Sequence, residues 1–254
     1  MNFGLRSTRL KLLRRAVVAV CCVLVLPLAA KEKAKPAPVQ IVDSGSFGVY
    51  SAGRRVGTET FSIRQDADGS VVSSEFKSEQ GEQKAVQSSE LRLTPSVELK
   101  LYTWKETLPE KSEATVEPSD AFLVEHYGAT VGGKQAEQNF LLPASTTILD
   151  DYFFIHREVL AWKYLATSCR KAKDGLQCPP NVKTQFGTLN PNARSSMAVS
   201  VEFSAREKLT IRGAEQQLNR FVLRSENGDW AFWLDDQFKL VRLLADNGTE
   251  VLRD

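Results

Sequence analysis

The chain has 254 residues, of which 42% are hydrophobic and 25% are charged, and its formal net charge is +2 at pH 7. This composition is that of a globular chain able to bury a core, which excludes a wholly disordered protein. The first fifteen residues contain five Lys and Arg residues, and without them the formal charge falls to −3. The remaining chain therefore lacks the basic surplus typical of nucleic-acid binding, and we expect no nucleic acid among its partners.

Residues 1–30 have the pattern of an export signal that is removed. The basic start precedes an apolar run at 16–26 that is too short to span a membrane, and the sequence LAA at 28–30 resembles a cleavage site. An uncleaved anchor is one alternative. Lipidation at Cys21 is another, although Val20 is larger than the residue that lipidation favours at that place. We expect cleavage near residue 30, a periplasmic or secreted location, and no stable transmembrane span afterwards.

Residues 31–43 are charged, contain two prolines and lack apolar periodicity, which predicts a flexible linker. The rest, 44–254, is predicted to be a single antiparallel β domain. Turn signals recur about every ten residues, as in a sandwich, a barrel or a large curled sheet. The sequence DADG at 66–69 predicts a tight hairpin turn. The first strands are expected at 47–52, 55–65, 71–78, 84–94, 97–107, 114–117 and 121–127.

The hydrophobic period changes at 147–166, where apolar residues recur at steps of three and four. Ile155, Val159 and Trp162 belong to this stripe, which predicts an amphipathic helix. Thr147 and Asp150 suit a capping box at its start. Because the stripe is rich in aromatic residues, we expect the helix to cover one face of the sheet.

Cys169 and Cys178 are the cysteines that remain after the signal. An oxidising compartment favours a disulfide between them. A redox pair is the alternative, but it usually has two residues between its cysteines, and eight intervene here. The segment 170–193 is predicted to be a loop. The disulfide between residues 169 and 178 would hold the base of this loop at the end of the helix. Further strands are expected at 197–205, 208–211, 217–225, 229–234, 239–245 and 250–252.

No arrangement of residues in the sequence predicts catalysis or metal binding. His126 and His156 lack a second His or Cys at ligand spacing, and a zinc site needs three or four such ligands. The chain has no Gly-x-Ser-x-Gly nucleophile elbow. The carboxylate pair at 150–151 suits a helix start and the pair at 235–236 suits a turn. We therefore expect no enzyme, no catalytic residue, no metal and no cofactor.

Aromatic residues on neighbouring segments are the candidate binding residues. Small serines at 73, 74, 88 and 89 lie mid-strand, where a dense core favours branched apolar side chains, so a curled sheet could enclose a cavity there. The residues expected to wall such a pocket are Phe61, Phe76, Tyr102, Trp104 and Phe122 on the strands and Trp162 on the helix. Serines also mark the wet face of a sheet, which is the alternative.

The last predicted hairpin is crowded with aromatic residues, among them Trp230, Phe232 and Trp233. Core packing of a closing strand pair explains them. An aromatic wall of a ligand cavity is the second interpretation.

Several short segments resemble an uncharacterised family of exported bacterial proteins. They are GVY at 48–50 with RVGTET at 55–60, LTP at 93–95, and WLDD at 233–236 followed by KLVR at 239–242. The resemblance spans about 46–254 and implies a curled antiparallel sheet. In layout this is similar to the half-barrels of periplasmic lipoprotein carriers, in which a helix covers the concave side. The family has no assigned activity to carry over, and the disulfide loop departs from its simplest pattern.

The sequence leaves three hypotheses. The first is a non-enzymatic periplasmic binding module for a hydrophobic ligand such as a lipid, in a half-barrel or open barrel plugged by one helix. The second is a structural or protein-interaction component of the cell envelope with a filled core and no ligand. The third is an enzyme of unrecognised type, which would need a cluster of convergent polar groups with perturbed pKa values.

Overall fold

A computed structural model describes residues 38–79, 84–129, 134–173 and 175–254. The predicted signal at 1–30 and the first part of the predicted linker lie outside them. The described residues fall within a unit that spans 36–254.

The described chain is mostly β-strand, with one helix after the ninth strand. The strands before the helix are β1 (Gln40–Ser51), β2 (Arg54–Asp66), β3 (Gly69–Ser78), β4 (Val86–Leu93), β5 (Leu99–Leu108), β6 (Ser112–Ser119), β7 (Phe122–Ala129), β8 (Ala136–Phe140) and β9 (Thr147–Ile148). The helix is α1 (Ile155–Ser168), followed by β10 (Arg170–Ala172), β11 (Gly175–Gln177), β12 (Lys183–Asn190), β13 (Ser195–Ile211), β14 (Ala214–Ser225), β15 (Gly228–Leu234), β16 (Leu240–Ala245) and β17 (Glu250–Arg253).

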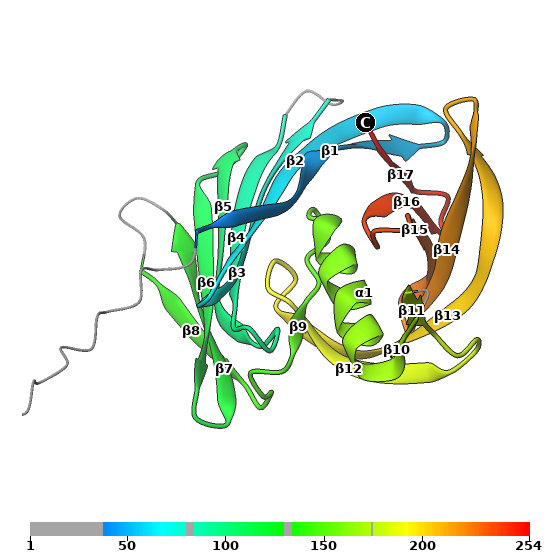
Figure 1. Ribbon diagram of the computed structural model, residues 1–254. Helices are drawn as coiled ribbons and strands as arrows, with labels where there is room; N and C mark the ends of the chain where they lie inside the picture. The colour runs from blue at the N-terminus through cyan, green and yellow to red at the C-terminus, as the bar shows by residue number, and fades with distance from the viewer. Residues whose placement is uncertain (1–37, 80–83, 130–133, 174) are drawn as a thin grey trace, which may run out of the picture. The chain divides into compact units, whose positions relative to one another are not determined.

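Fifteen of these strands form one sheet, which curls around α1 (Figure 1). Its order is β8-β7-β6-β5-β4-β3-β2-β1-β17-β16-β15-β14-β13-β12-β9, and the two end strands, β8 and β9, do not pair with each other. The sheet is therefore open, as expected for a half-barrel or open barrel. The predicted antiparallel arrangement is confirmed for all strand pairs of the described sheet but one at its edge, where β9 pairs with β12 in parallel.

Residue alternation decides which side chains face the inside of the sheet, and β-bulges allow the sheet to curl. In β4 buried and more accessible residues alternate along the strand, so every second side chain faces the inside. Phe61, Ser74, Ser89 and Trp104 are partners across successive strands and share one inner row. Register shifts interrupt β1 between Ile41 and Asp43, and β13, β16 and β5 contain others. Such bulges bend a strand and increase its twist, which allows a broad sheet to curl.

The predicted hairpin turn at 66–69 joins β2 to β3 and is confirmed. Asp66 pairs with Gly69, whose φ is +135°, a conformation that side chains with a Cβ rarely adopt. A Cβ at this position would also lie 1.9 Å from the carbonyl oxygen of Leu93. Only glycine therefore fits this turn against the neighbouring strand.

Helix α1 fills the interior of the curl. Its large apolar side chains, such as Ile155, Leu160 and Tyr164, are fully buried against the inner face of the sheet. The consecutive residues His156, Arg157 and Glu158 are also buried, so the first turns of the helix are enclosed on all sides. The prediction that a helix covers the sheet is confirmed, but the first turns of this helix have no solvent-exposed face.

The helix begins eight residues later than the sequence predicted. Thr147 and Ile148 form β9, and the N–H of Leu149 donates to the carbonyl of Leu189 over 3.0 Å. These backbone groups are used in strand pairing, so they cannot start a helix. The predicted capping box of Thr147 and Asp150 is wrong for the same reason.

Two further boundaries differ from prediction. Residues 40–43 belong to β1 rather than to a linker, because they pair with the end of β2. The predicted loop at 170–193 contains the hairpin β10–β11 and the sheet strand β12. The last three residues of β12, Thr188, Leu189 and Asn190, are all buried, so burial does not alternate at this end of the strand.

The sulfur atoms of Cys169 and Cys178 lie 2.09 Å apart, at disulfide distance, as predicted. The bond joins the end of α1 to the residue that follows β11, and so it closes the small hairpin β10–β11.

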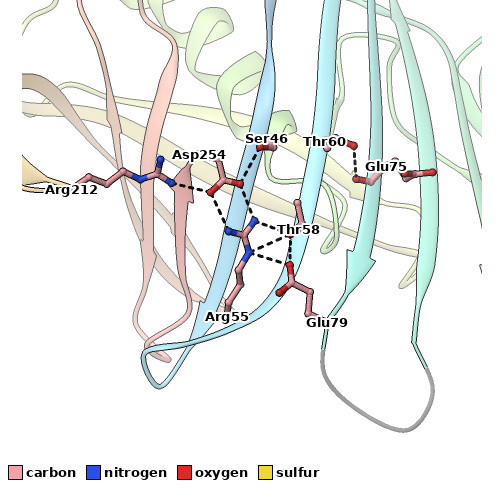
Figure 2. A network of polar contacts seen from close by, with 8 residues as sticks. All are labelled: Ser46, Arg55, Thr58, Thr60, Glu75, Glu79, Arg212 and Asp254. Atoms are coloured by element: carbon pink, nitrogen blue, oxygen red, sulfur yellow. Dashed lines mark hydrogen bonds and ion pairs between the residues drawn. The ribbon is translucent and has the colours of Figure 1, made fainter.

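A polar network on the surface ties the last strand to its neighbours (Figure 2). The Asp254 carboxylate accepts hydrogen bonds from Arg55 (2.8 and 3.2 Å), from Arg212 (2.9 Å) and from the hydroxyl of Ser46 (3.0 Å). Partial burial opposes ionisation of Asp254, but the bonds from Arg55 and Ser46 outweigh it and lower its pKa. The network thus joins the residue that follows β17 to β1, to β2 and to the β13–β14 turn.

Candidate functional site

The start of α1 is held by a carboxylate from the sheet. Glu59 of β2 is fully buried, and its oxygens accept the N–H groups of Phe154 (2.7 Å) and Ile155 (3.3 Å) and the hydroxyl of Ser74 (2.7 Å). The first N–H groups of a helix need such acceptors, and the helix dipole favours a negative charge there. Burial nevertheless raises the pKa of Glu59 to about 7.

A second carboxylate, in the first turn of α1, joins the helix to β16 and to the β1–β17 pair. Glu158 is fully buried and accepts the N–H of Leu240 over 2.6 Å. Arg253 of β17 lies 3.6 Å from the same oxygen and also pairs with the buried Asp43 of β1. Burial, together with the neighbouring charge of Asp43, raises the pKa of Glu158 well above its ordinary value. This cluster joins the helix to both strands of the β1–β17 seam.

A third set of polar groups lies between the helix and β4–β7. The Tyr102 hydroxyl donates to Asp150 over 2.9 Å, and the ring of His156 packs edge-on against Tyr102 with centroids 5.7 Å apart. Burial raises the pKa of Asp150 to about 6 and that of Glu125 to about 7. Burial also lowers the pKa of His156 to about 3, so this imidazole is neutral at physiological pH. His156 is therefore packed in the core, whereas His126 lies at the surface, 3.8 Å from Glu137.

A cavity of about 190 Å³ lies beside the start of the helix. It is bounded by the residues just before and within α1 and by the ends of β12–β16. Its apolar lining comes from Leu149, Met197, Val199, Leu223 and Trp230. Its polar lining comes from Arg157, Asp151, Thr188, Asn190, Ser225, Asn227, Asp229, Asp246 and Asn247. The arrangement can hold an apolar group with a polar end.

Arg157 is the one cation among the residues that line this cavity. Arg157 as a whole is 6% exposed, and its guanidinium lies 5.2 Å from the ring centroid of Trp230 and 5.4 Å from that of Phe154. Trp230 itself is only half-buried, so its ring forms part of the cavity wall. Cation–π contacts of this kind fix a guanidinium between two aromatic faces.

The structure distributes the predicted binding residues over several places. Phe61 stacks on Phe47 with centroids 4.7 Å apart, and it borders a depression of about 500 Å³ that crosses β2–β5. Phe76 packs against Tyr152 at 5.5 Å. Tyr102 is fully buried, and its hydroxyl donates to Asp150.

Trp104, Phe122 and Trp162 complete the predicted set. Trp104 donates its ring N–H to Gln87 over 3.0 Å and borders a cavity of about 320 Å³ between β5–β7 and residues 191–194. Phe122 is 42% exposed at the start of β7. Trp162 is half-buried and donates to the carbonyl of Phe238 over 2.8 Å. Phe61 and Trp104 share the inner row of the sheet, and none of the six lines the cavity beside Arg157.

The serines between the predicted aromatic residues divide by face. Ser74 and Ser89 share the inner row with Phe61 and Trp104, whereas Ser73 and Ser88 alternate with them and point the other way. The wet-face interpretation therefore holds for two of the four serines.

Sequence reasoning noticed Trp230 but missed Arg157. The aromatic wall considered for the last hairpin fits Trp230, whereas Phe232 is buried in the core. Trp233 belongs to a separate apolar cluster with Leu218 and Val241. Arg157 gave no signal, because a lone arginine in an amphipathic helix normally faces water.

Among the residues that the structure describes, no group of three or more His, Cys, Asp or Glu side chains is placed to hold a metal ion. Within the same residues, no helix has the length and apolar character needed to cross a membrane.

The fold has a counterpart among solved structures. It is similar to the crystal structure of a β-barrel-like protein of the domain of unknown function DUF1849 from Brucella abortus, with a TM-score of 0.53 and 11% sequence identity. The match covers 86% of this chain and 95% of that one. No family model and no curated protein matches the chain. The similarity confirms the resemblance to an uncharacterised β-rich domain, and at this identity it concerns the fold alone.

Proposed function

We propose that this protein is a non-enzymatic binding module, exported to the periplasm, that holds the apolar part of a lipid-like ligand. The observation that carries the proposal is the cavity of about 190 Å³ beside the helix start, with Trp230, Met197 and Leu223 in its wall. An apolar cavity of about 150 Å³ is enough to bind benzene, so this cavity can hold a ring or a short acyl segment.

The size of the cavity limits what it encloses. Pockets for whole drug-sized ligands usually measure about 300–1,000 Å³, so the ligand should extend beyond the cavity into solvent or onto the protein surface. Each methylene group that leaves water contributes about 0.8 kcal/mol. A segment of six methylene groups would thus contribute roughly 5 kcal/mol before the entropy cost of binding.

The non-enzymatic part of the proposal is supported by the roles of the buried acids. Glu59 and Glu158 accept backbone N–H groups, and Asp150 accepts the Tyr102 hydroxyl and the N–H of Tyr152. These interactions hold α1 inside the sheet. Burial at these structural positions raises the pKa values of the three acids without a reaction, since structural networks also shift pKa values.

Export is supported by the sequence of residues 1–30 and by the cysteine pair at disulfide distance, which suits an oxidising compartment. Expression of the full chain in a bacterial host, followed by intact-mass measurement of the periplasmic fraction, tests this part. The recovered protein should lack about thirty N-terminal residues. Recovery of a full-length species in the membrane fraction would contradict it.

A second candidate function is an interaction component of the cell envelope with a filled core. It is favoured by the dense packing of α1, in which Ile155, Leu160, Ala161 and Tyr164 are fully buried. It is also favoured by the exposed side chains of Phe122 and Leu141 near the open edge at β8.

Binding of an uncharged apolar fluorophore, N-phenyl-1-naphthylamine, separates the two functions. The wild type should bind the fluorophore, and Met197→Trp should abolish binding because the larger ring fills the cavity. Met197→Leu is the matched control and should retain binding. Native mass spectrometry of protein purified from a membrane-containing host should show a co-purified lipid-like adduct. If the wild-type protein binds no fluorophore and carries no adduct, the binding function is contradicted and the interaction function is favoured.

A further inference from the structure

The side chain of Arg157 is only partly satisfied by the protein. Its Nη1 donates to the backbone carbonyls of Asp150 (2.6 Å) and Phe153 (3.2 Å). Within the described part of the chain, Nε and Nη2 have no hydrogen-bond partner, and no carboxylate oxygen lies within 4.0 Å of the guanidinium. Both nitrogens keep accessible surface, and the residue lines the cavity.

A buried guanidinium without a counter-ion is costly. An arginine does not lose its proton in proteins, and an uncompensated buried charge destabilises the fold. Burial lowers the pKa of Arg157, and the charges of Asp151, Glu59 and Asp150 oppose that effect. Because burial raises the pKa of Glu59 to about 7 and that of Asp150 to about 6, these two carboxyls supply only part of a counter-charge near neutral pH.

The unused edge of Arg157 has the shape that a carboxylate requires. Nε and Nη2 are adjacent parallel donors, and this fork binds the two oxygens of a carboxylate at once. The rings of Phe154 and Trp230 flank the guanidinium, and Trp230 continues into the apolar wall formed by Met197 and Leu223. A carboxylate on Arg157 would therefore direct its apolar part along that wall.

Acidic residues in the lining limit the charge of the ligand. Asp151, Asp229 and Asp246 also border the cavity. Asp229 is paired with Arg224, whereas Asp151 and Asp246 have no cation within 4.0 Å among the described residues. Their negative charges disfavour a dianionic phosphate more than a singly charged carboxylate.

We propose that Arg157 is the headgroup site of this cavity and that the ligand is an amphipathic monocarboxylate, with its carboxylate on Nε and Nη2 and its chain or ring against Trp230. The inference rests on the proposed binding function and specifies the chemical class of its ligand.

Competition against bound N-phenyl-1-naphthylamine tests the ligand side on the wild-type protein. Octanoate should displace the fluorophore at a concentration at least tenfold lower than 1-octanol, which has the same chain and no charge. Inorganic phosphate should not displace it at the concentrations at which octanoate does. Equal potency of octanoate and octanol, or displacement by phosphate, would overturn the inference.

Variants of Arg157 test the protein side. Arg157→Met should bind the fluorophore and octanol but lose at least nine-tenths of the preference for octanoate. Arg157→Lys keeps the positive charge but lacks the paired donors of the guanidinium, so it should show an intermediate preference for octanoate. If circular dichroism shows that Arg157→Met is unfolded, Arg157→Lys is the deciding variant. Arg220→Met, on β14 and outside this cavity, is the matched control and should keep the full preference. An unchanged preference in a folded Arg157 variant would overturn the inference.

The outcomes separate the two proposals. Fluorophore binding without a carboxylate preference would remove the headgroup assignment and leave the binding function. Absence of fluorophore binding in the wild type would remove both.

Discussion

At the scale of single residues, the molecule depends on carboxyl groups placed where a β domain normally keeps apolar ones. Glu59 is on the inner face of β2, in the same row as Phe76 and Gln87 of the next two strands. Its position gives the helix start an acceptor that no nearby residue supplies, since Phe154 at the N-cap has no side-chain cap. The cap therefore comes from a residue 95 positions earlier in the chain.

We predict that Glu59 makes stability depend on pH. The ordinary pKa of a glutamate is 4.5, but that of Glu59 in the folded protein is about 7. Between pH 4.5 and pH 7 the folded protein therefore keeps a proton on Glu59 that the unfolded chain has lost. The stabilisation is complete below about pH 4.5 and is lost as pH rises through 7, a difference of about 3 kcal/mol. Urea unfolding of the wild type and of Glu59→Gln between pH 4.5 and 8 measures this pH-dependent difference in the free energy of unfolding.

The glutamine variant should show a flatter pH dependence by about that amount, because its amide does not titrate in this range. Glu75→Gln on β3, whose side chain is at the surface, is the control and should follow the wild type. Equal slopes for the wild type and Glu59→Gln would contradict the prediction.

At the scale of elements, α1 acts as the core of the sheet. An open curled sheet cannot bury its inner face by itself, and the helix supplies the apolar surface that fills it. Tyr164 shows how closely the two are joined: its hydroxyl donates to the carbonyl of Val182 over 3.0 Å and accepts the N–H of Phe203 over 3.2 Å. The helix is therefore bonded to the sheet at both its start and its last turns.

Truncation of a buried helix residue should be costly. Leu160 is fully buried in the core, and Leu160→Ala should lower the free energy of unfolding by about 2–5 kcal/mol through lost contacts and a residual cavity. Thr167→Ala, at an exposed position of the same helix, should change it by less than about 0.5 kcal/mol. Chemical denaturation followed by tryptophan fluorescence compares the two. A loss below about 1 kcal/mol for Leu160→Ala would show that the helix is not part of the core.

The cysteine pair has a similar element-level role. Replacing Cys169 and Cys178 by serine should lower stability by about 2.5–3 kcal/mol, the loop-closure contribution of a link of this length. Denaturation under oxidising conditions measures the difference. Non-reducing peptide mapping of exported protein should find the two cysteines linked, and two alkylated free thiols would contradict the assignment.

At the scale of the whole described unit, the seam between β1 and β17 joins the two halves of the sheet. Strands β2–β8 extend from one side of it and β12–β16 from the other. Asp43 and Arg253 cross the seam in a part of the interior that also contacts Glu158 of the helix. The Asp254 network crosses it at the surface (Figure 2).

These two crossings should differ in strength. Asp43 is 3% exposed, and Asp43→Asn should lower the free energy of unfolding by about 2–3 kcal/mol because it weakens charge-assisted bonds to Arg253. Asp254→Asn removes solvent-accessible ion pairs and should cost less than about 1 kcal/mol. Thermal and urea unfolding of both variants provides the comparison. A larger loss of stability for Asp254→Asn than for Asp43→Asn would show that the surface network, and not the buried Asp43–Arg253 pair, is the stronger link across the seam.

Much of the fold could be predicted because its determinants are local. The sequence at 66–69 specifies a turn, and the alternation along β3 and β4 specifies which residues share a face. The strands that were missed, such as β8 and β12, are edge or near-edge strands whose buried residues do not alternate. Their pairing depends on partners distant in sequence.

What the sequence by itself determined is the class: many short strands, one aromatic helix, and a cysteine pair close enough to join. Only the tertiary structure decided where the helix begins, that Glu59, Arg157 and Glu158 are enclosed, and that Trp230 rather than the six predicted aromatic residues borders the cavity beside Arg157. The physical reason is the curl of the sheet. Local patterns fix which way a side chain points, but enclosure depends on how far a sheet of fifteen strands wraps around the helix, and that follows from long-range pairing.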